Sequence, residues 1–151
     1  MSPTPVRFYD PGATLSHFAA SVLVRCPRCE RIAHFGRGPC TAAEREGGRC
    51  RESRVICRSC GLCRVDTDRY FRPPLWLQTE TRHGRLWAYN LEHLDLIRRF
   101  VSADLRERAP WYETGRKMTL VGRLPAWIKS AKNRDEILRA VHRLQVSVIS
   151  D

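Results

Sequence analysis

Two stretches decide the fold of this chain: Cys26-Pro27-Arg28-Cys29 and Cys57-Arg58-Ser59-Cys60. Each C-x-x-C turn places two thiolates side by side, where backbone N–H groups of the turn can donate to the sulfurs. Two such turns complete a tetrahedral site with four sulfur ligands, which suits Zn²⁺. We therefore predict a structural zinc site with Cys26, Cys29, Cys57 and Cys60 as ligands. Four protein ligands leave no open position for catalysis.

The segments around the two cysteine pairs indicate short strands. Apolar residues precede each pair in 21–25 and 53–56, and further strand patterns follow in 31–35 and 62–71. Gly61 directly after Cys60 suits a turn that requires a positive φ, whereas Glu30 holds the corresponding place after Cys29. Two knuckles between strands resemble a zinc ribbon over residues 21–72. A loop rich in glycine and charge, 36–52, would separate the two halves of the ribbon.

Three more cysteines, Cys40, Cys50 and Cys63, lie outside this pattern. We expect them to be accessory thiols, although a second zinc site with His34 is an alternative. The run Cys57-x2-Cys60-x2-Cys63 would also fit part of an iron–sulfur motif, but that motif needs a fourth cysteine where Thr67 stands. Cys40 and Cys50 could form a disulfide under oxidising conditions.

The second half of the chain predicts a hairpin followed by helices. Alternating segments 75–81 and 85–89 flank the turn Arg82-His83-Gly84, which is typical of a β-hairpin. Asn90 is a candidate N-cap for a helix over 91–108, which Pro110 would end. Further helices are predicted over 125–130 and, from a capping box of Asn133 and Glu136, to about Gln145.

These elements predict an α+β fold: a zinc ribbon whose antiparallel sheet is extended by the hairpin, followed by C-terminal helices. We divide the chain into an N-terminal arm (1–20), a ribbon with hairpin (21–90) and a basic helical tail packed on the sheet (91–151). The sequence contains no apolar run long enough to span a membrane and no export signal, so we expect a cytoplasmic protein without a membrane partner.

Three segments of the second half carry a resemblance over most of residues 22–145. They are Leu75-Trp-Leu-Gln-Thr-Glu, Leu86-Trp-Ala-Tyr-Asn-Leu-Glu-His-Leu and Arg123-Leu-Pro-Ala-Trp-Ile-Lys-Ser-Ala-Lys-Asn-Arg. Together they resemble an uncharacterised family of small bacterial zinc-ribbon proteins, some loosely labelled transcription-factor-type zinc ribbon or primosomal-helicase-like. The resemblance implies a ribbon followed by a helical tail and the same four cysteine ligands. It implies no settled function.

The charge of the chain indicates a polyanionic partner. The formal net charge is +11 and the pI is about 10.0, which favours nucleic acid, either DNA or RNA. The basic excess divides evenly between the cysteine-bearing segment, 21–70, and residues 106–151, with a net charge of +5 in each. The residues that we predict to contact phosphates are Arg116, Lys117, Arg123, Lys129, Lys132, Arg134 and Arg139.

The aromatic residues have two interpretations, because they could stack on unpaired bases or pack beneath the helices. Trp76, Trp87, Tyr89 and Trp127 are expected to pack, whereas Trp111-Tyr112 lies in a loop beside basic residues. No catalytic motif is recognisable, so we expect a protein that is not an enzyme.

The leading hypothesis is therefore a nucleic-acid-binding or regulatory accessory factor. The first alternative is a protein–protein adaptor that docks on a larger transcription, replication or repair complex. The second is a metal- or thiol-dependent enzyme.

Overall fold

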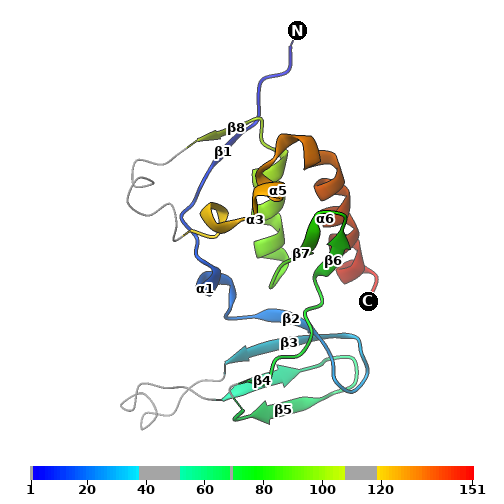
Figure 1. Ribbon diagram of the computed structural model, residues 1–151. Coiled ribbons are helices and arrows are strands. Elements are labelled where there is room, and N and C mark those ends of the chain that lie inside the picture. Colours follow the sequence, from blue (N-terminus) through cyan, green and yellow to red (C-terminus); the bar gives the residue numbers. More distant parts are fainter. Residues whose placement is uncertain (1, 38–51, 69, 108–118) are drawn as a thin grey trace, which may run out of the picture.

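The two C-x-x-C turns lie at one end of a four-stranded antiparallel sheet (Figure 1). The computed structural model describes residues 2–37, 52–68, 70–107 and 119–151. The strands, in the order β2-β3-β4-β5, are β2 (Val22–Arg25), β3 (Ile32–Arg37), β4 (Ser53–Ile56) and β5 (Cys63–Asp66). One face of this sheet buries small and aromatic side chains, namely Val22, Val24, Ala33, Phe35 and Val55. The sheet and the helices that follow it confirm the predicted α+β fold.

The predicted hairpin is present as β6 (Gln78–Thr81) and β7 (Gly84–Trp87). It forms a separate two-stranded sheet, whereas we expected it to extend the ribbon sheet. The physical reason is burial: Leu77 and Leu86 are 0% and 1% exposed and pack in the core beneath the helices. A single isolated bridge between Val24 and Leu75 links this region to the ribbon sheet.

Two amphipathic helices, α3 (Leu91–Ser102) and α6 (Arg134–Ile149), pack against each other and form the larger core. Asn90 caps α3 as predicted, because its side-chain oxygen accepts the backbone N–H of His93 at 2.9 Å. Short elements complete this part: α1 (Leu15–Phe18), α5 (Ala126–Lys129) and the 3₁₀ turns η1 (Val121–Arg123) and η2 (Ala131–Asn133).

Two predicted helix ends and one predicted cap in this half are wrong. The helix predicted to reach 108 ends at Ser102, because Ala103 is extended and β8 (Leu105–Glu107) pairs in parallel with β1 (Arg7–Tyr9). Asn133 occupies the predicted N-cap position of α6, but its side chain does not cap the helix and donates instead to the Trp127 carbonyl at 2.9 Å. The last helix continues past Gln145 to Ile149.

Residues 2–20 contribute to the main core. Phe8 on β1 and Phe18 on α1 are 4% and 3% exposed, and Phe8 packs edge-on against Phe100 of α3. The Asp10 carboxylate accepts the hydroxyl of Thr119 at 3.0 Å, which fixes the segment that leads into η1. No helix in the described part of the chain is long and apolar enough to cross a membrane.

Strand β2 joins the ribbon to the helical part. One edge pairs with β3, while on the other edge the Leu23 N–H donates to Tyr89 and the Leu23 carbonyl accepts the N–H of Trp76. Leu23 packs in the helical core, whereas Val22 and Val24 pack in the ribbon core. The end that carries the cysteines is therefore held to the rest of the protein by backbone hydrogen bonds as well as by packing.

Candidate metal centre

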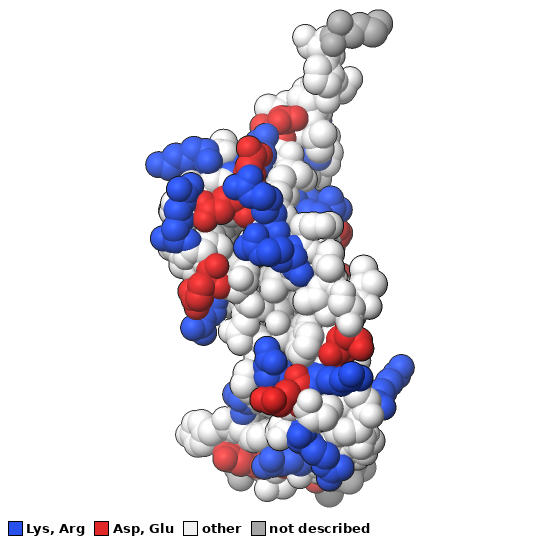
Figure 2. All heavy atoms as spheres, turned by 90° about the vertical axis from the view of Figure 1, so that its right-hand side faces the viewer, with Lys and Arg blue, Asp and Glu red and all other residues white. Residues whose placement is uncertain are grey.

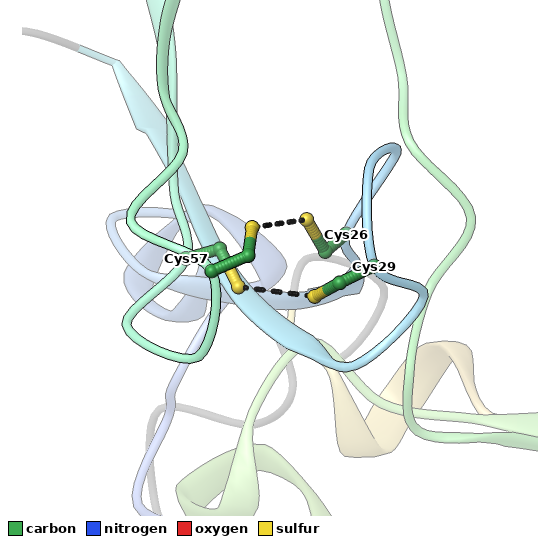
Figure 3. A group of neighbouring side chains, drawn as sticks. Cys26, Cys29 and Cys57 are labelled. Atoms are coloured by element: carbon green, nitrogen blue, oxygen red, sulfur yellow. Dashed lines mark hydrogen bonds between the residues drawn. The ribbon is translucent and has the colours of Figure 1, made fainter.

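Four cysteine side chains converge between the two turns, and their Sγ atoms all lie within 4.8 Å of one another. The Sγ–Sγ distances are 3.7 Å for Cys26–Cys60 and 3.6 Å for Cys29–Cys57, so each contact joins one turn to the other (Figure 3). Zn–S bonds of about 2.3 Å in a tetrahedron place the sulfurs about 3.8 Å apart. The observed spacing therefore fits a tetrahedral four-sulfur metal site.

The two turns have the same backbone design. In the first, the N–H of Cys26 donates to the carbonyl of Arg31 at 2.8 Å, and in the second the N–H of Cys57 donates to Leu62 at 2.8 Å. Each bond spans five residues and closes a loop that contains both cysteines of the pair. The two loops lie at the same end of the sheet because β2 and β4 run in the same direction.

The residue after the second cysteine of each turn has a positive φ. Gly61 has φ +75°, as its place in the sequence predicts, and Glu30 adopts φ +63° at the corresponding position of the first turn. The left-handed region costs a residue with a Cβ about 1–2 kcal/mol. The fold therefore imposes the same turn on both knuckles, even though only the second carries the residue best suited to it.

The thiols are electrostatically coupled. Burial raises the pKa of Cys26, but the backbone N–H groups of Cys29 and Arg28 outweigh it and bring that pKa down to about 6. The N–H of Arg31 lowers the pKa of Cys29, yet burial and the three neighbouring thiols together raise it to about 12. One sulfur thus ionises readily while another holds its proton, because negative charges this close repel one another. A divalent cation would remove this penalty by neutralising the thiolates.

Burial and ligand number define the chemistry of the site. Cys26 and Cys57 are 1% exposed, and Cys29 and Cys60 are half-buried. The four cysteines form a candidate metal-binding site, and the all-sulfur donor set suits Zn²⁺. A bound ion would link the β2–β3 turn to the β4–β5 turn and would hold the small ribbon core together.

The other cysteines do not join this cluster where the structure describes them. Cys63 lies on β5 opposite Ile56 and is exposed. The cysteines at 40 and 50 lie outside the described residues. His34 is on β3 with an exposed side chain, and within the described chain the cluster of metal-ligating groups consists of the four predicted cysteines.

The predicted phosphate-binding residues have different surroundings. Lys129 donates from Nζ to the Gly122 carbonyl at 2.8 Å, and Arg134 pairs with Asp104 at 3.1 Å and donates to the Ala103 carbonyl at 2.9 Å. These two cations hold elements of the core together. Three others, Arg123, Lys132 and Arg139, have exposed side chains, while Arg116 and Lys117 lie outside the described residues.

Three of the aromatic residues pack against the main core, as expected: Trp76, Tyr89 and Trp127. Trp87 contacts the ring of His93 edge-on, with centroids 5.6 Å apart. All four side chains are half-buried. Trp76 donates from Nε1 to Ser147 at 3.1 Å, and Trp127 stacks on His83 with ring centroids 6.1 Å apart. The pair at 111 and 112 lies outside the described residues.

Sequence reasoning did not single out the arginines of the two knuckles. Arg28, Arg31 and Arg58 are exposed, and they make no ion pair within the described structure. The signal that could have revealed them is their position, because the residues inside and directly after a C-x-x-C turn point outward when the sulfurs point inward.

No protein-family model matches the chain, and no curated protein or solved structure matches it significantly. The bacterial zinc-ribbon family therefore stays a prediction, and the function must be argued from the residues themselves.

Proposed function

We propose that this protein is a zinc-ribbon accessory factor that binds nucleic acid. The observation that carries the proposal is the exposed arginines on a turn pair whose backbone the four cysteines would fix. Arg28 and Arg58 lie within the two C-x-x-C turns, one in each, and Arg31 follows the first. Metal-bound turns would present these guanidinium groups at defined positions, where they can bind phosphate oxygens.

Charge on the rest of the molecule supports the same partner. Figure 2 views the side that carries α6 and the C-terminus, and Lys and Arg side chains lie over both the helical part and the ribbon, with Asp and Glu between them. Lys132 and Arg139 contribute exposed cations on the helical part. A tetrathiolate zinc site carries a formal charge of −2, so the arginines of the knuckles also offset the charge of the metal centre.

The test is binding of fluorescently labelled single- and double-stranded oligonucleotides, followed by anisotropy over a salt series. Affinity should fall steeply with salt, because each phosphate contact releases counterions. The double variant R28Q/R58Q replaces one arginine in each knuckle and should lower the affinity. For duplex DNA, the slope of log K against log salt should become shallower by about 1.8, because each of the two lost phosphate contacts accounts for about 0.9.

A matched control removes the same charge elsewhere. Arg98 and Arg99 on α3 both pair with Asp95, at 2.7 and 3.1 Å, so the variant R98Q/R99Q should leave the salt slope unchanged. An equal effect of both double variants would show that net charge alone drives binding. No binding at low salt would refute the proposal.

A protein–protein adaptor is the second candidate, and the outer face of the ribbon favours it. Ile56 and Val65 are 43% and 50% exposed on adjacent strands, and within the described chain β5 pairs only with β4. An open strand edge beside apolar side chains can accept a strand from another protein. Pull-down from cells with and without nuclease separates the two functions, since nuclease would release only partners that nucleic acid bridges.

A further inference from the structure

A cavity of about 400 Å³ lies in the helical part of the protein, away from the cysteines. Residues of α1, β7, α3, η1 and α5 line it, and these elements lie together above the ribbon in Figure 1. Its deepest walls are apolar, since Ile97, Leu120 and Ile128 are 1%, 5% and 3% exposed. Both the volume and the apolar lining are typical of sites for small molecules.

One polar side chain in the wall of the cavity uses only one of its two ring nitrogens in a hydrogen bond within the described chain. His93 is 2% exposed and lines the cavity. Its Nδ1 accepts the backbone N–H of Tyr89 at 3.0 Å, so in the neutral ring the proton resides on Nε2. No residue of the described structure accepts a hydrogen bond from Nε2. Burial lowers the pKa of His93 to about 4, so the ring is neutral at pH 7 and Nε2–H is a donor.

The charged residues that line the cavity are both basic. Arg85 on β7 and Arg123 on η1 are exposed, and none of the described residues that line the cavity is acidic. Arg85 pairs with Glu80 at 2.7 Å, but its side chain stays 61% exposed and can reorient toward a ligand. The cavity thus combines a buried neutral donor, apolar walls and the cation of Arg85 near solvent.

We propose that this cavity binds a small aromatic carboxylate that carries a second oxygen. The aromatic ring packs against the apolar walls and against Trp87, which also lines the cavity. The second oxygen, from a hydroxyl or carbonyl group, accepts the hydrogen bond from His93 Nε2. The carboxylate faces Arg85 near solvent. This inference goes beyond the proposed function, because neither the cysteines nor the knuckle arginines take part in it.

The test uses three related probes in calorimetric titrations of the full chain. 4-Hydroxyphenylacetate has all three features, phenylacetate lacks the second oxygen, and 4-hydroxyphenethyl alcohol lacks the carboxylate. We expect saturable binding of 4-hydroxyphenylacetate and about tenfold weaker binding of each of the other two probes. Phenylacetate loses the buried hydrogen bond, and 4-hydroxyphenethyl alcohol loses the charge-assisted one. Amide shifts in NMR spectra should change at Ile97 and Leu120 and stay unchanged at Val55 in the ribbon.

Two arginine variants make the test independent of folding. The variant R85Q should weaken 4-hydroxyphenylacetate about tenfold and leave the alcohol unaffected. The control is R82Q, in the same hairpin but outside the cavity lining, where Arg82 pairs with Glu136 at 2.8 Å. It should bind all three probes like the unaltered protein. The proposal is overturned if 4-hydroxyphenylacetate shows no saturable binding, if the three probes bind equally, or if R85Q and R82Q behave alike.

Discussion

Replacing Cys57 by serine is the sharpest perturbation of the metal centre. Cys57 is 1% exposed, and its Sγ lies 3.6 Å from that of Cys29, so the substitution removes a ligand from the interior of the cluster. Structural zinc sites contribute about 10–16 kcal/mol in total. An even share for each of four ligands is about 2.5–4 kcal/mol, which corresponds to an affinity loss of about 10²- to 10³-fold.

The assay for this variant is competition between the protein and a chromophoric chelator, with the zinc content checked by native mass spectrometry. The control is Cys63→Ser, which changes a cysteine on the adjacent strand β5 whose side chain is exposed and outside the cluster. We expect one zinc per chain and unchanged affinity in this control. Equal losses in the two variants, or iron in the purified protein, would refute the four-cysteine zinc site.

Hydrogen exchange of the backbone amides would show which parts of the protein lose protection when the metal is removed. The N–H of Leu23 donates to Tyr89 and that of Trp76 donates to Leu23, which are bonds to the helical part. Because alternate residues of a strand point to opposite edges, the N–H groups of Val22 and Val24 point toward β3. After chelation, Val22 and Val24 should lose protection while Leu23 and Trp76 keep it. Simultaneous loss at all four amides would show that the two parts unfold together.

Three further predictions concern stability, measured by chemical denaturation of the zinc-loaded protein. The variant E30G should stabilise the protein by about 1 kcal/mol and G61A should destabilise it by a similar amount, because both residues have a positive φ. A Cβ at Gly61 would meet no atom within 4 Å, so the effect of G61A reports the backbone conformation alone. Stability changes of the same sign in the two variants would contradict the shared turn design. The folded pKa of His93, about 4, lies below its unfolded value of 6.5, so the unfolded state takes up a proton first and stability is lost as pH falls through this window. Between pH 7 and pH 5 this loss of unfolding free energy is about 2 kcal/mol, and the variant H93Q should not show it. If the unfolding free energies of the two proteins change in parallel with pH, His93 is not the cause. Leu77→Ala should cost about 2–5 kcal/mol, since Leu77 is fully buried in the main core, whereas Leu91→Ala at an exposed site should cost far less.

The cluster of four cysteines could be predicted from the sequence because the pattern that specifies it is local. A C-x-x-C turn needs only four consecutive residues, and the strands on either side follow from short apolar patterns. The pairing of β1 with β8 could not be predicted, because it joins Arg7 to Leu105 across almost the whole chain. Leu105 continues the helical spacing of α3, so the pattern favoured a longer helix, and the bond from the Val6 N–H to the Asp104 carboxylate has no counterpart in any local signal.

The roles of the basic residues also could not be predicted from the sequence, because they depend on contacts with the backbone. Sequence spacing identified Lys129 and Arg134 as cations of the tail, but Lys129 donates to the carbonyl of Gly122, and Arg134 donates to the carbonyl of Ala103 besides pairing with Asp104. A count of charged residues does not include backbone carbonyls. In the sequence, a cation that binds a carbonyl and holds two elements together therefore cannot be distinguished from one that is available to bind phosphate. Burial and hydrogen bonding separate these roles, and they direct the nucleic-acid experiments to the knuckle arginines.

Strand β2 connects the candidate metal centre to the helical part of the protein. Its residues Val22, Leu23 and Val24 are all buried, although a strand at the surface of a sheet normally alternates between buried and exposed side chains. A continuous apolar run indicates a strand that is covered on both faces, and here the two faces belong to different cores: valines to the ribbon, Leu23 to the helices. Because Tyr89 packs against both cores and bonds to Leu23, a shift of β2 would be felt two residues along the chain at Leu91, where α3 begins. A metal ion bound by the four cysteines would therefore stabilise the position of β2 and, through it, the start of the helix that carries His93.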